Sequence, residues 1–289
     1  MPEGDTIYRA ARALQRAIAG KVVTGFETGL AKLARVNDDA PLVGRVVDKV
    51  ESRGKWLLIY FSGDLILATH MLMSGSWHLY RIGERWQMGR NRMRALIRTE
   101  EWEAVAFNVP VMEFHTQRTL ERSPVSKLGR DILAIDFEIA EGVLMLKRCR
   151  EQHPEAEIGV VLLNQQVLAG LGNIYKSEVA FAAAVNPFRA MRTITLKEME
   201  RIVEHAHRYM TANIAEGKGS GIVTYSGSRS TTHAMDRGER LWVYRRQGKE
   251  CRRCGATVMM RKQGSQARST YWCPVCQPWI SDEAEQFYS

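Results

Sequence analysis

The chain has 289 residues, of which 45% are hydrophobic, and this length allows two domains, or one domain and a smaller stapled module. This composition excludes a globally disordered chain, and no stretch is apolar for long enough to cross a bilayer. The formal net charge of +9 favours a polyanionic partner such as nucleic acid, although a basic enzyme without such a partner is the alternative.

The first predicted element is an amphipathic helix over residues 6–19, which ends at Gly20. Apolar residues recur there at steps of four and three, and therefore share one face: Ile7, Ala11, Leu14 and Ile18. Residues 1–5, which precede the helix, are acidic and lack the apolar segment of a secretory signal. We therefore expect a cytoplasmic protein.

The next region, from residue 22 to about residue 113, has the pattern of β-strands. Short runs rich in β-branched, aliphatic and aromatic residues alternate with turn residues, as at 57–61, 65–68, 95–97 and 104–107. Several short strands at this spacing predict an antiparallel sandwich or barrel. Ser123-Pro124 is a plausible linker, so we expect a first domain over residues 1–123.

The helical period returns after residue 131 and predicts a second domain over residues 124–240. One apolar stripe recurs at helical spacing and is interpreted as core: Met199, Ile202, Val203, Ala206, Met210 and Ile214. Residues 216–229 are rich in Gly and Ser and predict a mobile loop.

Four of the five cysteines lie in the last segment, residues 241–289, with the spacing Cys251-x2-Cys254-x18-Cys273-x2-Cys276. Two CxxC pairs joined by a hairpin-sized insert are typical of one tetrahedral zinc ion, and four protein ligands leave no position for a catalytic water. Four unrelated thiols or a redox pair fit the regular double spacing less well. We predict a structural zinc-finger module. Cys149 has no predicted role beyond packing.

The first residues also suggest an active site. Removal of Met1 would expose the amine of Pro2, and an α-amino group titrates near ~8, against ~10.4 for a lysine. A neutral secondary amine can attack a sugar C1′ and form an iminium, and the neighbouring Glu3 could move the protons. Many unrelated chains share this start, so the pattern needs support from elsewhere.

That support comes from four further segments that occur in one chain and in a fixed order. They are 53–57 (Arg-Gly-Lys-Trp-Leu), 69–75 (Thr-His-Met-Leu-Met-Ser-Gly), 165–175 (Gln-x4-Gly-Leu-Gly-Asn-Ile-Tyr) and 268–277 (Arg-Ser-Thr-Tyr-Trp-Cys-Pro-x-Cys-Gln). With the start Met-Pro-Glu-Gly-Asp, they resemble the formamidopyrimidine-DNA glycosylase and endonuclease VIII family over nearly the whole length. The two ends look more like the endonuclease VIII branch.

The resemblance implies an α+β multidomain fold. An N-terminal helix and an antiparallel β-sandwich would be followed by a helix-two-turns-helix domain with a C-terminal four-cysteine zinc-finger hairpin. It implies a bifunctional DNA glycosylase and AP lyase that acts as a monomer on damaged double-stranded DNA. Oxidised pyrimidines are favoured as substrates, and β,δ-elimination would proceed through a Schiff base.

Seven residues of this chain match functional positions of the family. The resemblance implies that Pro2 is the nucleophile, that Glu3 is its acid-base partner, and that Lys55 touches phosphate and assists catalysis. It implies DNA contacts for four more residues: His70 on phosphate, Met73 as the wedge that replaces an extruded base, Asn173 at a helix N-terminus, and Arg268 in the zinc finger. Without the resemblance, His70 and Met73 would be read as core residues and Lys55 as a solvated lysine.

The chain departs from the family at Thr6, where a second glutamate is common, so a proton relay would need Asp5 or water instead. Further wedge residues near 109–112 cannot be aligned. Three alternatives stay open: an oxidised-purine glycosylase, a DNA-binding zinc protein without catalysis, and a zinc-ribbon interaction protein. The last of these leaves the N-terminal and helix-turn segments unexplained.

Overall fold

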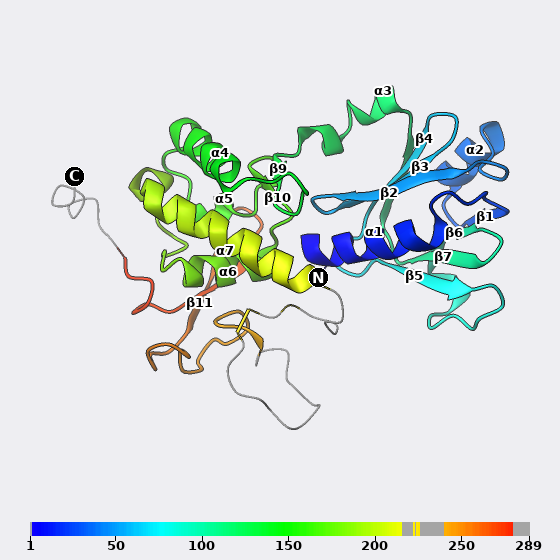
Figure 1. Cartoon of the computed structure of the whole chain (residues 1–289). Helices are drawn as coiled ribbons and strands as arrows, with labels where there is room; N and C mark the ends of the chain where they lie inside the picture. The colour runs from blue at the N-terminus through cyan, green and yellow to red at the C-terminus, as the bar shows by residue number, and fades with distance from the viewer. Residues whose placement is uncertain (1, 216–221, 223, 226–239, 280–289) are drawn as a thin grey trace. The chain divides into compact units, whose positions relative to one another are not determined.

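The computed structural model describes residues 2–215, 222, 224–225 and 240–279 (Figure 1). The chain divides into two compact units, residues 1–128 and 129–289. Met1, whose removal was predicted, and most of the Gly/Ser-rich segment 216–229 lie outside the described residues. The predicted domain boundaries at 123 and 240 stay predictions. Each unit is described by itself.

Unit 1 contains two four-stranded antiparallel sheets. The first has the order β2-β3-β4-β8, with β2 (Val47–Arg53), β3 (Trp56–Phe61), β4 (Leu65–His70) and β8 (Val111–His115). The second has the order β1-β6-β7-β5, with β1 (Gly25–Thr28), β6 (Met93–Arg98), β7 (Trp102–Phe107) and β5 (Ser76–Arg81). The predicted sandwich is confirmed.

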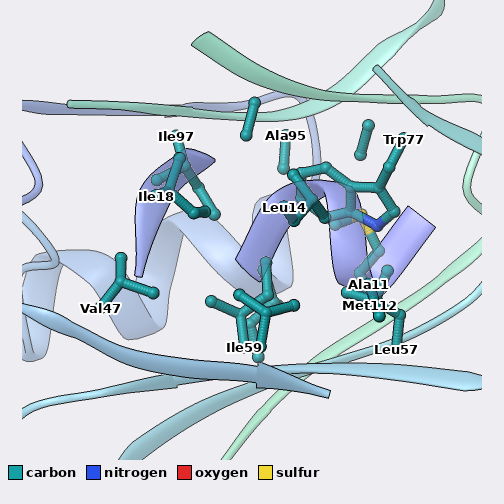
Figure 2. Close-up of a cluster of buried hydrophobic side chains, with 14 of the residues drawn as sticks. Ala11, Leu14, Ile18, Val47, Leu57, Ile59, Trp77, Ala95, Ile97 and Met112 are labelled. Atoms are coloured by element: carbon teal, nitrogen blue, oxygen red, sulfur yellow. The ribbon is translucent and has the colours of Figure 1, made fainter. Parts of the chain in front are cut away.

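Helix α1 (Gly4–Ile18) lies between the two sheets (Figure 2). The apolar face that the sequence predicted is buried on both sides, and Leu14 is 1% exposed. Leu57 and Ile59 of β3 pack on one side of the helix, while Ala95, Ile97 and Trp77 come from the other sheet. The helix is amphipathic: its apolar face, on which the small Ala11 and Ala17 allow a close approach, packs between the sheets, whereas Arg12 and Arg16 on the opposite face stay exposed.

The outer face of the first sheet is covered by the chain that follows β8. Strand β3 alternates, so that Leu57 faces α1 while Leu58 faces a second cluster containing Leu120 and Val125. These two residues come from α3 (Gln117–Leu120) and the 3-10 turn η2 (Pro124–Lys127). The expected linker at Ser123-Pro124 is therefore a packed turn, in which Ser123 Oγ accepts the N–H of Val125. The remaining short elements of unit 1 are α2 (Ala31–Asp39) and η1 (Arg90–Arg92).

Unit 2 is mainly helical, as predicted. Its elements are β9 (Arg130–Asp131), α4 (Ile139–Gln152), α5 (Ile158–Val161), β10 (Leu168–Ala169), α6 (Asn173–Ala182), η3 (Met191–Thr193) and α7 (Leu196–Ile214). Five members of the predicted stripe on α7 are fully buried, and Ile214 is half-buried. Gly142 of α4 lies against Val203 of α7, where a Cβ would meet the valine at 2.6 Å, so only glycine allows this helix contact.

The C-terminal part of unit 2 contains the predicted hairpin. Strands β11 (Met259–Gln263) and β12 (Arg268–Trp272) pair antiparallel, and β12 packs against α6. A small apolar cluster joins Phe181 of α6 to Val243, Val258 and two of the cysteines. The predicted fold class is confirmed. Among the described helices, none has the length and apolar character to cross a membrane.

The packing of α1 makes unit 1 sensitive to its central side chain. We expect Leu14→Ala to lower the free energy of unfolding by about 2–5 kcal/mol, because it leaves a cavity between two sheets that cannot both collapse into it. Arg12→Ala, at an exposed position of the same helix, should change it by less than about 0.5 kcal/mol. Denaturant unfolding followed by tryptophan fluorescence checks this, and equal effects of the two changes would contradict it.

Candidate functional site

Pro2 and Glu3 lie at the N-terminal end of α1. Pro2 is half-buried, whereas Glu3 is fully buried and occupies the N-cap position. The backbone carbonyl of Glu3 accepts the N–H groups of Thr6 and Ile7, but its side chain makes no capping hydrogen bond. The positive end of the helix dipole stabilises a carboxylate there. The structure therefore holds an acid beside Pro2 that is not used to cap its own helix.

Asp5 is a second buried carboxyl group in this first turn. Its oxygens accept no hydrogen bond of good geometry, and its nearest described cation is Arg9, with 3.5 Å between Arg9 Nη2 and Asp5 Oδ2. Burial raises the pKa of Asp5, and Arg9 opposes the rise. Thr6, which stands where the family often has a glutamate, is half-buried. Position 6 therefore has no acidic side chain, but the neighbouring Asp5 provides one, and its raised pKa means that it keeps its proton more readily than an exposed aspartate.

Lys55 and His70 come together at one end of the first sheet. Lys55 follows Gly54 in the two-residue turn between β2 and β3, and Gly54 has the positive φ (57°) that such a turn requires. Trp56, the next residue, pairs directly with His70 at the end of β4. Burial and the charge of Lys55 lower the pKa of His70 to about 4. Its ring is therefore neutral at pH 7.

Met73 lies on a tight exposed turn immediately after His70. Gly75 N donates to Met71 O at 2.9 Å, and a Cβ at Gly75 would lie 2.6 Å from that same oxygen, so only glycine closes the turn. Leu72 has a left-handed φ of 46°. Met73 is 66% exposed and Leu72 is 46% exposed. The reading of Met73 as a core methionine is wrong, since the side chain is presented to solvent.

The path of α1 along β2 brings these groups to the same end of unit 1. The C-terminal end of α1 is tied to the start of β2, because Gly20 N donates to Val47 O at 2.8 Å. Further back, Gln15 accepts the N–H of Val50, and Ala11 lies beside Leu57 (Figure 2). The helix therefore runs antiparallel to β2, and its first residues lie towards the end of β2 that leads into the Lys55 turn. The sequence alone did not show this alignment.

Asn173 is the first residue of α6 and follows the turn 170–172, in which Gly170 has φ 104°. A simple phosphate contact would suggest an exposed side chain, but the side chain of Asn173 is buried. Asn173 is 7% exposed, its Nδ2 donates to Ser269 O at 2.9 Å, and its Oδ1 has no hydrogen-bond partner in the described structure. The structure thus joins Asn173 to the hairpin that carries Arg268.

Arg268 begins strand β12 on that hairpin. Its guanidinium donates to Gln266 Oε1 from Nε and Nη2, at 3.1 and 2.8 Å. Among the described residues it forms no ion pair with a carboxylate. A cation held by a neutral amide keeps its full charge for an anionic ligand.

A buried polar network, which the sequence analysis missed, holds this hairpin against α6. Lys176 is fully buried and donates from Nζ to Thr270 Oγ1 at 2.5 Å. Thr270 Oγ1 donates in turn to Gln263 Oε1, and Gln263 Nε2 donates to Glu157 and to the carbonyl of Pro187. No local pattern identifies such residues, because each partner lies on a different element. The network fixes the position of the strands on either side of the hairpin tip.

Glu178 is a second feature that the sequence did not reveal. Its fully buried carboxylate accepts the backbone N–H groups of Trp242, Val243 and Tyr244, at 2.7–2.9 Å, and the hydroxyl of Thr224. Burial raises the pKa of Glu178, and these hydrogen bonds oppose the rise. One carboxylate of α6 therefore anchors the two described segments that flank residues 226–239.

The four predicted cysteine ligands converge. Their sulfur atoms all lie within 4.8 Å of one another, with 3.9 Å between Cys251 and Cys276 and 3.5 Å between Cys254 and Cys273. Backbone N–H groups of Arg253 and Cys276 point at the first cysteine of each pair, as in a metal-binding turn. The cluster could hold a metal ion, and Cys149 lies apart from it, buried in α4.

Comparisons with known proteins agree with this architecture. The formamidopyrimidine-DNA glycosylase N-terminal domain matches residues 1–123, and the formamidopyrimidine-DNA glycosylase H2TH domain matches residues 128–225. Solved structures of the Lactococcus lactis formamidopyrimidine-DNA glycosylase with DNA that contains an abasic site share the fold. Two of them have TM-scores of 0.77 and 0.78 at 21% and 24% identity, and each alignment covers 96% of this chain and 100% of the other.

Curated relatives are more similar in sequence. A probable endonuclease 8 2 from Streptomyces coelicolor is 36% identical, over 96% of this chain and 94% of the relative. The DNA-(apurinic or apyrimidinic site) lyase Nei2 of Mycolicibacterium smegmatis is 34% identical, over 96% and 99%. A formamidopyrimidine-DNA glycosylase of Bacillus cereus is 29% identical, over 97% and 100%. The resemblance drawn from the sequence is thereby confirmed, and the chain belongs to the formamidopyrimidine-DNA glycosylase and endonuclease 8 family.

Proposed function

We propose that the protein is a bifunctional DNA glycosylase and AP lyase of base excision repair, which removes oxidised bases from duplex DNA and then cuts the strand. The observation that carries this proposal is the placement of Pro2 and the buried Glu3 at the end of unit 1 that also holds Lys55 and His70. An amine, an acid and a phosphate-binding cation are the groups that this chemistry needs.

In the proposed reaction the Pro2 amine, once Met1 has been removed, attacks C1′ of the damaged nucleotide. A nitrogen–carbon bond forms while the glycosidic bond breaks, and the base leaves with the bonding electrons and takes up a proton. The proline nitrogen then loses its proton, and the C1′–O4′ bond of the sugar ring breaks as O4′ takes up a proton. The resulting open-chain iminium acidifies the C2′ protons. Loss of one such proton expels the 3′-phosphate (β-elimination), and a second elimination expels the 5′-phosphate (δ-elimination). Water then releases the sugar fragment from the proline.

Glu3 and Lys55 assist these steps. Glu3 is buried at the positive end of α1, within one residue of the nucleophile, and can take and return the protons of the amine and the sugar. Lys55, on its short turn, holds a phosphate and stabilises the charge that develops as it leaves. Asp5, whose burial raises its pKa, is a second proton donor in the same helical turn.

His70, Met73, Asn173 and Arg268 are proposed to bind DNA. Met73 is an exposed apolar side chain on a closed turn, which suits a wedge that fills the space left by an extruded base. Arg268 offers an unneutralised charge, and the N-terminus of α6 at Asn173 offers N–H groups to a phosphate.

The four-cysteine cluster is proposed to hold one structural zinc ion. A tetrahedral site with zinc–sulfur bonds of about 2.3 Å places its sulfur atoms about 3.8 Å apart. The two sulfur–sulfur distances of 3.5 and 3.9 Å fit this value. Bound zinc would brace the base of the Arg268 hairpin and take no part in the reaction.

Oxidised pyrimidines are the proposed preferred substrates. The relatives named endonuclease 8 or Nei2 are 36% and 34% identical, against 29% for the glycosylase named after formamidopyrimidine. Oxidised purines are the second candidate substrates, because the solved structures that share the described fold are formamidopyrimidine-DNA glycosylases. We further propose that the enzyme acts as a cytoplasmic monomer, bound to double-stranded DNA.

Borohydride trapping tests the nucleophile and the substrate together. On duplexes with an oxidised pyrimidine, 8-oxoguanine or an abasic site, we expect a covalent adduct that maps to Pro2, with the pyrimidine lesion preferred over 8-oxoguanine. A short tag before Pro2 should abolish the adduct because it blocks the amine, whereas the same tag at the C-terminus should not. An adduct that survives N-terminal blocking would assign the nucleophile elsewhere. No adduct on any duplex, with the free proline verified, would favour a DNA-binding protein without catalysis.

Salt titration tests Arg268. Arg268→Ala should weaken binding to a duplex with a stable abasic analogue and make the plot of log K against log salt shallower by about 0.9, the effect of one lost phosphate contact. Arg81→Ala is the matched control, because the guanidinium of Arg81 is already paired with Glu101 at 2.6 Å. The same affinity and slope for Arg268→Ala and the wild type would refute the phosphate contact.

Metal analysis tests the zinc site. We expect about one zinc per chain, since four thiolates complete one coordination sphere. Cys273→Ser should lose the metal and destabilise the hairpin, whereas Cys149→Ser should keep it, because Cys149 lies outside the cluster. Fully folded, DNA-binding protein without metal would contradict a structural role.

A further inference from the structure

The imidazole of His70 is held in one orientation. His70 is the last residue of β4 and pairs with Trp56 on one side and with Val111 on the other. Its half-buried ring meets the indole of Trp56 edge-on, with 5.1 Å between the ring centroids and an interplanar angle of 84°. A ring gripped in this way points its two nitrogens in fixed directions.

One of these nitrogens accepts a hydrogen bond from the turn that carries Met73. The backbone N–H of Leu72 donates to His70 Nδ1 at 3.1 Å. A nitrogen that accepts a hydrogen bond carries no proton, so the ring proton of neutral His70 is on Nε2. Burial and the charge of Lys55 lower the pKa of His70 to about 4, and the ring therefore keeps this single tautomer at physiological pH.

The bond to Leu72 closes a turn of unusual backbone. Leu72 has φ 46°, a conformation that a leucine adopts only when the surrounding structure imposes it. The turn is completed by the bond from Gly75 N to Met71 O, and it exposes both Leu72 and Met73. His70 Nδ1 thus stabilises the conformation in which the apolar side chains point outward.

We propose that His70 is a positioning residue that couples phosphate binding to wedge insertion. Its Nδ1 holds the turn with Met73 exposed, while its Nε2–H donates, as a neutral group, to a DNA phosphate. This inference rests on the proposed function and adds to it a link between two contacts that would otherwise be independent. A charged His70 could not serve both, because a proton on Nδ1 would break the bond to Leu72.

Two amide substitutions separate the two nitrogens. Asn at position 70 places an amide oxygen where Nδ1 lies and loses the Nε2–H donor, whereas Gln places an amide nitrogen near Nε2 and loses the acceptor for Leu72. Each variant is therefore the control for the other: His70→Asn keeps the acceptor for Leu72, and His70→Gln keeps the donor for the phosphate. Thermal melting of both variants establishes that they fold.

Binding and base extrusion are measured on one duplex, with a stable abasic analogue beside 2-aminopurine, whose fluorescence rises when it unstacks. His70→Asn should weaken binding by about ten-fold, the effect of one lost hydrogen bond to a charged group, with an unchanged salt slope because no charge is lost. Its fluorescence at saturating protein should match the wild type. His70→Gln should bind more tightly than His70→Asn, but its fluorescence at saturation and its single-turnover excision rate should fall, by about three- to ten-fold for the rate.

The effect of His70→Gln should also disappear in a Met73→Ala background, because the turn then has no wedge to present. Full fluorescence in His70→Gln, or an undiminished effect of His70→Gln without Met73, would overturn the coupling. A salt slope shallower by about 0.9 in His70→Asn would overturn the neutral donor. Failure of the wild type to excise any lesion or to form a trapped adduct would instead refute the proposed function.

Discussion

The enclosure of α1 between two sheets is the constraint on which the candidate active site depends. A residue at the end of a chain is ordinarily mobile, and a mobile nucleophile cannot be held in attacking geometry. Here the apolar face of the helix that follows Pro2 is buried by both sheets, and hydrogen bonds of Gln15 and Gly20 tie its C-terminal part to β2. The stability of the unit 1 core is thereby used to position Pro2 and Glu3.

Unit 2 positions its candidate DNA contacts in another way. Besides the apolar contacts of Tyr271 and Trp272, the hairpin of Arg268 is held by buried polar groups that satisfy one another, from Lys176 through Thr270 to Gln263. Such bonds are directional, so they fix the register of the hairpin on α6 more closely than apolar contacts would. Removing one partner would leave another buried and unsatisfied, which is why these groups act as a unit.

His70 and Glu178 each position an adjacent segment through hydrogen bonds to its backbone. Each uses one side chain to hold backbone N–H groups of a segment that leaves the packed core: Leu72 in one case, and residues 242–244 in the other. Backbone groups near an exposed turn have no strand or helix to pair with, and an acceptor side chain from a regular element replaces that pairing. In both places the rigid elements of the fold thereby control the exposed ones.

The sequence by itself determined the features that depend on local spacing. Four patterns each encode an element or a site within a short window: the helical period in α1, the apolar run of β3, the stripe on α7 and the double CxxC spacing. The candidate site residues Pro2, Glu3, Lys55, His70 and Met73 were predicted from short segments that resemble a known family, because Lys55, His70 and Met73 carry no signal of their own. Only the tertiary structure decided the tautomer of His70, the bond from Asn173 to Ser269, and the networks around Lys176 and Glu178. In unit 2 the bonds from the hairpin to other elements join residues 76 to 106 positions apart, and those of Glu178 join residues 46 to 66 positions apart. No local pattern records a pairing that forms only when distant elements pack. His70 and Leu72 are neighbours in sequence, but the orientation of the ring is set by Trp56 on another strand, and its neutral state by burial and Lys55.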